Sequence, residues 1–348
     1  MGLSRAWPRR QTRTSRGTTQ VKVTVHSLAA AIVAAGALCT ASLPANAYRA
    51  FISNEKDNTV SVIDTHTWKV IETMKVGQRP RGILLAHGKE WLLICTSDDN
   101  RIEVYDAKTY AFIKNLPSGP DPELMVLHPS GNPLYVANED DNLVTVVDVE
   151  EGKIVAKVPV GVEPEGMAVS PDGKTVINTS ETTNMAHFID TTTYETKANI
   201  LVDNRPRVAQ FTDDGKQLWV SAEIGGTVSI IDVAKKEVIH KITFEIPGIT
   251  AEAIQPVGIA INKDATKAFV ALGPANRVAV IDAATHTVEK YILVGQRVWN
   301  ISFTPDEKYI LTTNGVSNDV TVIDTGKLRG FKSIPVGRYP WGVTITDD

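Results

Sequence analysis

One aspartate position recurs along the chain at a nearly constant interval. It closes an aliphatic run seven times, at Asp64, Asp106, Asp148, Asp190, Asp232, Asp282 and Asp324. Successive members are 42 residues apart, except for one interval of 50 that follows Asp232. A period of about 40–45 residues is typical of a four-stranded propeller blade. The repeat therefore predicts an array of small units of one kind.

Each unit also carries a second marker and a uniform pattern of short strands. The marker, a Pro-x-Gly motif or a variant of it, lies at 76–82, 118–124, 160–166, 202–208, 253–259, 294–300 and 336–342. Within residues 165–199, four short runs rich in β-branched and aliphatic residues alternate with Pro-, Gly-, Asp-, Asn- and Thr-containing turns. No window shows a sustained 3.6-residue apolar period. We therefore expect an all-β chain with four antiparallel strands in each unit.

The two ends of the array complement each other. Three strands are expected near 48–53, 59–64 and 68–75, with no innermost strand before them, and a single strand, Trp341–Thr346, ends the array. We predict that this last strand completes the first blade. Residues 48–348 would then form a seven-bladed β-propeller of four-stranded antiparallel blades, closed by pairing of the C-terminal strand with the N-terminal blade. Closure would also remove open sheet edges.

Residues 1–47 have the composition of a secretion signal. Six basic residues and no acidic residue precede an apolar run over 28–38, and a small-residue cleavage site follows at Ala45–Ala47. The apolar run is shorter than a membrane-spanning helix requires. We expect the mature protein to begin at Tyr48 and to be periplasmic or secreted, without a membrane anchor.

The charge and the cysteine count exclude several classes of function. Loss of the signal removes six of 36 basic residues and leaves 30 against 40 acidic residues, which disfavours nucleic acid as a partner. Cys95 is the single cysteine after residue 47, which excludes an internal disulfide, a thiolate cluster and a C-x-x-C-H haem site. The histidines show no ligand spacing, so no metal site is expected. No G-x-S-x-G motif is present and no catalytic residue is assigned.

The blade sequences resemble a known repeat family. The motifs concerned are PLYVAN at 133–138, KAFVAL at 267–272 and KYILTTN at 308–314, followed by VTVVD, VAVID and VTVID. They are similar to the YVTN family of β-propeller repeats. More narrowly, residues 48–348 resemble the exported propellers associated with PQQ-dependent catabolism. That resemblance implies a periplasmic accessory role near PQQ metabolism, with a quinoprotein dehydrogenase as a partner.

The repeated aspartate invites a metal or catalytic interpretation, but a structural one explains all seven copies at once. A side chain at the end of a strand can accept hydrogen bonds from the following turn. We therefore interpret the seven aspartates as turn-stabilising residues.

The loops that enter the innermost strands differ between blades and should meet at one mouth of the central channel. The residue after the Pro position is Arg81, Glu123, Glu165, Arg207, Val257, Trp299 or Trp341. The residue before it is Arg79, Asp121, Glu163, Arg205, Gln255, Arg297 or Tyr339. The loops between second and third strands add Glu55, Asp98, Glu139, Glu181 and Glu223. One half of the mouth is thus predicted to be acidic, and the other half cationic and aromatic.

Two interpretations of this mouth stay open. In the first, it binds a small anionic ligand or a loop of a periplasmic protein through Arg79, Arg81, Arg207, Arg297, Trp299 and Trp341. PQQ, a planar tricarboxylate, is a candidate ligand because indoles stack on planar rings and guanidinium groups bind carboxylates. An insertion near 245–255 could cover it. In the second, Arg81 pairs with Glu123, Arg207 pairs with Glu165, and the tryptophans fill the channel.

From these observations we expect a non-catalytic binding or accessory protein. The alternatives are a propeller enzyme, either a lactonase-like hydrolase or a subunit of a quinoprotein dehydrogenase, and a purely structural platform for protein interactions. The fold alone does not choose among them.

Overall fold

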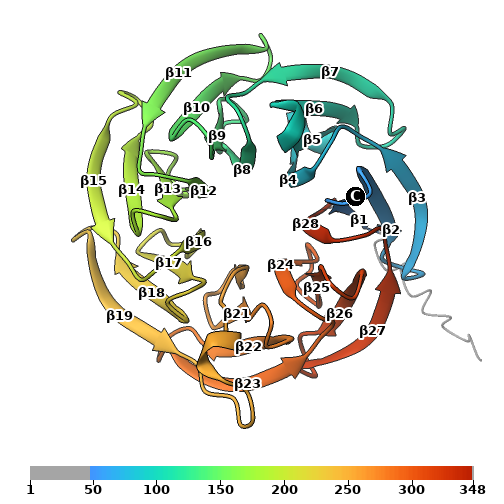
Figure 1. Cartoon of the computed structure of the whole chain (residues 1–348), viewed down its shortest axis with the longest axis vertical. Helices are drawn as coiled ribbons and strands as arrows, with labels where there is room; N and C mark the ends of the chain where they lie inside the picture. The colour runs from blue at the N-terminus through green and yellow to red at the C-terminus, as the bar shows by residue number, and fades with distance from the viewer. Residues whose placement is uncertain (1–47, 347–348) are drawn as a thin grey trace, which may run out of the picture. The chain divides into compact units, whose positions relative to one another are not determined.

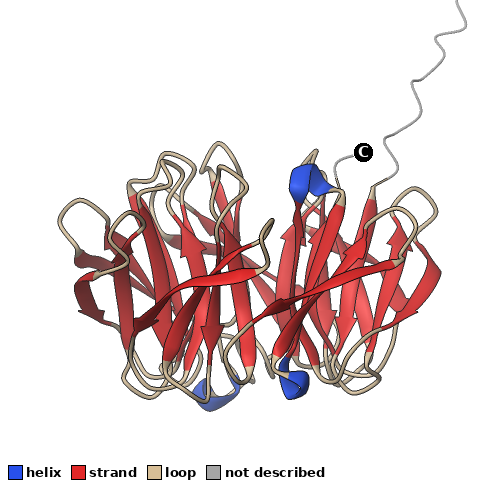
Figure 2. Ribbon diagram, turned by 90° about the horizontal axis from the view of Figure 1, so that it is seen from above, coloured by secondary structure: helices blue, strands red, loops and turns tan. Residues whose placement is uncertain are grey.

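The computed structural model describes residues 48–346, and the predicted secretion signal over 1–47 lies outside the described residues. The described chain forms seven antiparallel sheets of four strands each, arranged as a ring around a central axis (Figure 1). Seen from the side, the strands run between two faces of the ring, and loops cover both faces (Figure 2). The predicted seven-bladed β-propeller is confirmed.

The blades are numbered along the chain, and their strands are given from the axis outward. Blade 1 contains β28 (Pro340–Ile345), β1 (Arg49–Asn54), β2 (Thr59–Asp64) and β3 (Lys69–Lys75). Blade 2 contains β4 (Pro80–Ala86), β5 (Trp91–Thr96), β6 (Arg101–Asp106) and β7 (Phe112–Pro117). Blade 3 contains β8 (Pro122–Leu127), β9 (Leu134–Asn138), β10 (Leu143–Asp148) and β11 (Lys153–Pro159). Blade 4 contains β12 (Pro164–Val169), β13 (Thr175–Ser180), β14 (Met185–Asp190) and β15 (Thr196–Leu201).

The other three blades follow the same order. Blade 5 contains β16 (Pro206–Phe211), β17 (Gln217–Ala222), β18 (Thr227–Asp232) and β19 (Glu237–Thr243). Blade 6 contains β20 (Ile259–Ile261), β21 (Lys267–Ala271), β22 (Arg277–Asp282) and β23 (Thr287–Leu293). Blade 7 contains β24 (Val298–Phe303), β25 (Tyr309–Asn314), β26 (Asp319–Asp324) and β27 (Arg329–Pro335). Three short 3-10 turns are η1 (His87–Lys89), η2 (Ser97–Asp99) and η3 (Ala251–Ala253).

The burial of each strand explains its sequence. Neighbouring blades pack face to face, so both faces of an inner strand are covered, and β5 buries five consecutive residues. The outermost strand β3 buries a single residue, Met74, and is otherwise polar or part exposed. The core consequently lies between blades. One cluster, for example, joins Leu93 and Val104 of blade 2 to Val136 of blade 3.

The ring closes as predicted. Strand β28 pairs with β1 in antiparallel register, with Ala50 opposite Ile345 and Ile52 opposite Val343. The last strand of the array is therefore the innermost strand of the first blade. Among residues 48–346, no helix has the length and apolar character needed to cross a membrane.

The structural interpretation of the seven repeated aspartates agrees with the hydrogen bonds. Each Oδ1 accepts a hydrogen bond from the backbone N–H three residues later, as in Asp64 with Thr67 at 2.6 Å and Asp232 with Lys235 at 2.9 Å. The other five pairs are Asp106–Thr109, Asp148–Glu151, Asp190–Thr193, Asp282–Thr285 and Asp324–Lys327. Each aspartate fixes the turn between a third and a fourth strand.

Candidate functional site

A tight loop places the side chains that form the mouth of the channel. The residue before the Pro position has a left-handed backbone, with φ of 54° at Arg79, 56° at Arg297 and 59° at Tyr339. Its N–H donates to the Oδ1 atom of an asparagine 21 residues earlier, at 3.0 Å for Arg79 with Asn58. The asparagines in this role are Asn58, Asn100, Asn142, Asn184, Asn276 and Asn318. Sequence analysis missed them, although they keep the 42-residue spacing except between Asn184 and Asn276, where blade 5 has no such asparagine.

Arg207 occupies the centre of the acidic half of the mouth. Its side chain is only 4 % exposed. The guanidinium group lies 2.8 Å from Glu165, donates a hydrogen bond to Glu181 and lies 3.8 Å from Glu223. The neighbouring Arg205 is 45 % exposed and reaches the same two carboxylates, Glu181 at 2.8 Å and Glu223 at 3.1 Å. Blades 4 and 5 are thus joined by a buried network of ion pairs.

A second network joins blades 2 and 3. Arg81 lies 2.6 Å from Glu123, which is fully buried, and 3.7 Å from Glu55. Arg79 lies 2.5 Å from Asp121 and 3.1 Å from the same Glu123. Both ion pairs of the second interpretation, Arg81 with Glu123 and Arg207 with Glu165, are therefore present.

The two tryptophans differ in exposure although they occupy the same motif position in adjacent blades. Trp341 is 1 % exposed, and the guanidinium of Arg81 lies 5.2 Å from its ring centroid. Trp299 is only half-buried and has two guanidinium groups near its ring, that of Arg297 at 4.0 Å from the ring centroid and that of Arg207 at 5.8 Å. Neither indole N–H, although buried, has a hydrogen-bond acceptor among the described residues.

The residues of the rim beside Trp299 differ from those at the equivalent positions of other blades. Arg297 lies 2.5 Å from both Glu223 and the side-chain oxygen of Gln255. A Cβ atom on Gly315 would lie 2.5 Å from Trp299 Nε1, so a glycine leaves room for this indole. The register of the first and second strands places Glu55, Glu139, Glu181 and Glu223 at the corresponding positions of other blades. Blade 7 thus has a glycine, with the Trp299 indole packed against it, at the position where four other blades carry a glutamate.

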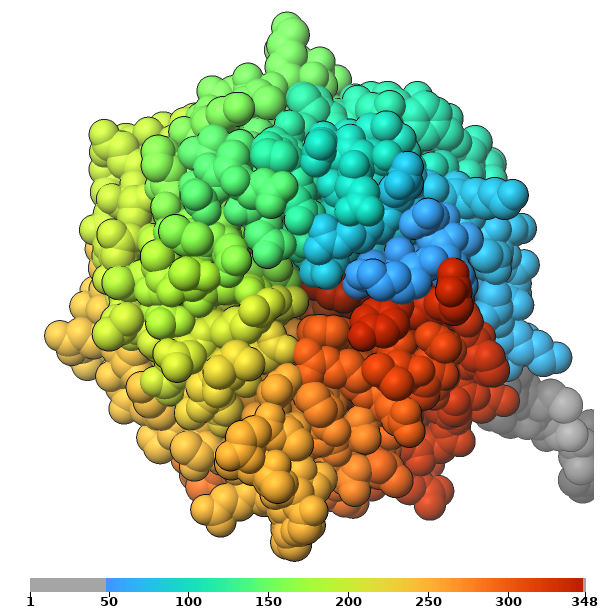
Figure 3. Space-filling model, in the orientation of Figure 1, coloured from blue at the N-terminus to red at the C-terminus, as the bar shows by residue number. Residues whose placement is uncertain are grey.

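The structure places all six predicted site residues at this one end of the channel, in two groups. Arg79, Arg81 and Trp341 lie on the side of blades 1 to 3, and Arg207, Arg297 and Trp299 on the side of blades 5 to 7. The mouth faces the viewer in Figure 3, where atoms fill the middle of the ring. Behind it, the innermost strands surround a cavity of about 150 Å³ whose wall includes Trp341.

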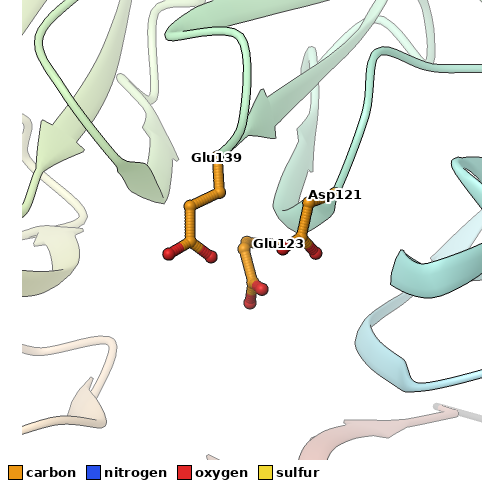
Figure 4. Close-up of side chains that lie close together, drawn as sticks. All are labelled: Asp121, Glu123 and Glu139. Atoms are coloured by element: carbon orange, nitrogen blue, oxygen red, sulfur yellow. The ribbon is translucent and has the colours of Figure 1, made fainter.

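The carboxylates of the mouth outnumber its guanidinium groups. Asp121, Glu123 and Glu139 approach one another within 4.8 Å (Figure 4). Burial raises the pKa of Glu123 well above its usual range, with repulsion from Glu165 adding to the rise and Arg81 opposing it. Burial also raises the pKa of Glu181 to about 7, against the opposing charge of Arg207. Burial therefore disfavours the charged form of these two carboxyl groups, and the arginines oppose that effect.

A metal ion at these three carboxylates would have to compete with arginines. Asp121 and Glu123 are already held by Arg79, and Glu123 also by Arg81. The ion would displace both guanidinium groups, so we assign no metal to this cluster.

Comparison with protein families assigns the chain. The family model described as "Choice-of-anchor I domain" matches residues 140–316, slightly more than half of the sequence. The chain belongs to the choice-of-anchor I domain family. Comparison with curated protein sequences finds no match.

Solved structures similar to this choice-of-anchor I domain protein share its fold. Hydrazine synthase from Kuenenia stuttgartiensis aligns with a TM-score of 0.73 and 22 % identity, over 79 % of this chain and 92 % of that one. Two structures described as candidate 6-phosphogluconolactonases are also similar. The one from Bacteroides fragilis has a TM-score of 0.73 and 18 % identity over 86 % and 98 % of the two chains. The one from Bacteroides uniformis has a TM-score of 0.74 and 16 % identity over 87 % and 100 %. At these identities the likeness establishes the propeller fold.

Blade 4 of this choice-of-anchor I domain protein contains a row of side chains with the spacing of a hydrolase triad. Ser180 Oγ lies 3.0 Å from His187 Nε2, and His187 Nδ1 lies 2.6 Å from Asn199 Oδ1. Sequence analysis missed this row because its members meet only through the register of β13, β14 and β15.

Two observations make this row structural. The N–H of Gly161 already donates to His187 Nε2 at 3.0 Å, so the nitrogen that would accept the serine proton is occupied, and Ser180 is fully buried. The same position in blade 2 is Glu103, which accepts the N–H of Gly77 at 2.9 Å. The histidine therefore fills a repeated structural role in the choice-of-anchor I domain.

Proposed function

We propose that this protein is an exported, non-catalytic binding protein that holds a planar anionic ligand at the rim of its channel mouth. PQQ is the ligand that the sequence resemblance favours, and a quinoprotein dehydrogenase is the corresponding partner. The proposal rests on one observation, the half-buried Trp299 next to Arg297 on the rim. An indole with a guanidinium group over one of its faces can offer its other face for stacking and the guanidinium for a carboxylate.

The location of the ligand follows from the charges. Anions are repelled from the centre, because buried carboxylates there exceed the arginines that pair with them. Arg297 is 17 % exposed and would turn part of its guanidinium from Glu223 and Gln255 to the ligand, whereas Arg207 is almost wholly enclosed by glutamates. The neighbouring ring of Tyr339 has Lys56 above it at 5.9 Å, which adds a second aromatic and cationic pair. The ligand should therefore bind off the axis, over blades 7 and 1.

In this proposal the six predicted site residues have different roles. Arg297 and Trp299 contact the ligand. Trp341 and Arg207 close the channel beneath it, since both are almost fully buried. Arg79 and Arg81 neutralise Asp121 and Glu123 on the far side of the mouth.

Calorimetric titration with PQQ tests this function. Wild-type protein should bind PQQ saturably, and added salt should weaken the binding because the attraction is partly electrostatic. Trp299→Ala and Arg297→Gln should each weaken binding by more than about 1 kcal/mol, roughly fivefold in Kd. Glu123→Gln should leave the affinity unchanged or improve it.

The matched control is Lys290→Ala, which removes an exposed charge from the outer strand β23. It should bind as wild type does. If wild-type protein shows no saturable heat, or if both rim variants bind with wild-type affinity, the mouth is not the PQQ site. The channel end would then be a structural closure of the ring.

A further inference from the structure

Blade 4 carries a groove whose lining shares no residue with the mouth network. It has a volume of about 300 Å³ and forms where the segment from β11 to β12 meets β14 and β15. Its lining comprises Pro159, Val160, Gly161, Thr183, Met185, His187, Thr196 and Asn199. None of these side chains carries a fixed charge.

Equivalent positions in blades 2 and 5 carry ion pairs. In blade 2 they include Asp99, Arg101 and Glu103, where Arg101 lies 3.2 Å from Asp99 and 2.7 Å from Glu103. In blade 5, Lys241 lies 2.5 Å from Asp203. Blade 4 thus differs from blades 2 and 5, because neutral side chains replace these ion pairs.

The hydrogen bonds fix the state of the histidine. The Gly161 N–H donates to Nε2, so Nε2 is an acceptor and the ring proton resides on Nδ1, which donates to Asn199. Burial lowers the pKa of His187, with the Asn199 contact opposing the change, and the ring is therefore neutral at pH 7.

Two hydroxyl groups in the groove lack partners. The Oγ1 atoms of Thr183 and Thr196 are buried and make no hydrogen bond with any described residue. A buried hydroxyl without a partner is unfavourable, and each group can both donate and accept. Beside them, the flexible thioether of Met185 offers an adaptable apolar wall.

We infer that this groove is a second binding site, for a small neutral molecule that has an apolar body and a hydroxyl or carbonyl group. Ions are excluded because no opposite charge in the lining would offset their desolvation. The volume lies at the lower end of the range of ligand pockets, so the ligand is small. Its polar group bonds the threonine hydroxyls and its apolar part packs on Met185.

Three probes of one shape and different charge test this inference. Benzyl alcohol, benzoate and benzylammonium are titrated at pH 7 into protein labelled with ¹³C at the methionine methyl groups. Met185 lies in the groove, whereas Met74 is buried in blade 1 and serves as the internal reference. Benzyl alcohol should shift the Met185 resonance saturably, and both ions should bind at least tenfold more weakly.

Two variants assign the polar contacts. Thr183→Val and Thr196→Val keep the branched shape and remove one hydroxyl each, and should weaken benzyl alcohol binding by about three- to tenfold. Thr73→Val, an exposed threonine on β3, is the matched control and should have no effect. The inference is overturned if Met185 shows no saturable shift, if the three probes bind equally, or if both groove variants bind as wild type does. The mouth takes no part in these measurements, so their outcome is independent of the proposed PQQ site.

Discussion

Replacement of Arg207 by methionine is the sharpest test of the buried charge network. Methionine keeps most of the volume of the side chain but removes the cation that lies 2.8 Å from Glu165 and bonds Glu181. Both carboxylates are at least 97 % buried, so no water replaces the lost partner. Breaking a buried ion pair from one side typically costs about 3–5 kcal/mol. We expect a loss in this range in the free energy of unfolding.

The exposed neighbour provides the control. Arg205 reaches the same acidic cluster, but its side chain is 45 % exposed. After Arg205→Met, Glu181 keeps Arg207, and Glu223 keeps Arg297 at 2.5 Å. A surface pair contributes about 0–1 kcal/mol, so this variant should unfold almost as wild type does.

The loss of stability caused by Arg207→Met should also depend on pH, and the pKa of Glu181 sets the direction of that dependence. Its pKa is about 7 in the folded protein, above the value of an unfolded chain, and removal of Arg207 raises it further. A carboxyl group whose pKa is raised by folding stabilises the fold fully below its pKa in the unfolded chain, near 4.5. This stabilisation is lost as the pH rises through its pKa in the folded protein. The deficit should therefore be larger at pH 8 than at pH 5.

Thermal unfolding followed by circular dichroism at the two pH values measures these effects. An unfolding entropy of about 2 cal/mol/K per residue over roughly 300 residues converts 3–5 kcal/mol into a fall in Tm of about 5–8 °C. Equal Tm values for the Arg207 and Arg205 variants, or a deficit that grows toward pH 5, would refute the assignment of Arg207 as the central cation.

Three further predictions concern the ring, the leader and the turns. Deletion of residues 340–348 removes β28 and opens blade 1, so the protein should aggregate or fail to fold; size-exclusion chromatography checks this, and a monomer of normal Tm would contradict it. Intact-mass spectrometry of protein from its host should give Tyr48 as the first residue, whereas a retained leader or a lipid on Cys39 would contradict export as a soluble protein. Hydrogen bonds from Lys216 and Thr212 lower the pKa of Asp214 to about 2, and turn hydrogen bonds also lower the pKa of Asp190. These lowered values stabilise the fold above pH 4, so stability should fall between about pH 4 and pH 2, and an acid titration that leaves the fold unchanged to pH 2 would contradict this.

The repeat made the fold predictable to within one residue at several strand ends. The strand expected at 59–64 is β2, and the one expected at 68–75 is β3 from Lys69. Local signals suffice here because each blade repeats the same turns, and turns such as those after the repeated aspartates are fixed by side chains only a few residues away. Closure followed from counting strands at the two ends, which requires no knowledge of distant contacts.

The sequence predicted which residues lie at the mouth, but not how their side chains are arranged there. The position of Trp299 and Trp341 after the loop is the same, yet one is half-buried and the other fully buried. The difference arises from neighbours in other loops, such as Gly315 beside Trp299, and from which guanidinium group covers each ring. Such contacts depend on rotamers and on the spacing between blades, which a repeat pattern does not encode.

The repeat provides an internal reference for separating structure from function. A position that makes the same hydrogen bond in several blades, such as His187 with Gly161 and Glu103 with Gly77, needs no functional explanation. A position that breaks the pattern and leaves a polar group without a partner does need one, because the fold could have used the repeated residue instead. Trp299 on the rim and Thr183 in blade 4 meet this criterion, since both contain a buried, unpartnered polar atom. Both positions are therefore candidates for ligand binding on the evidence of the repeat alone.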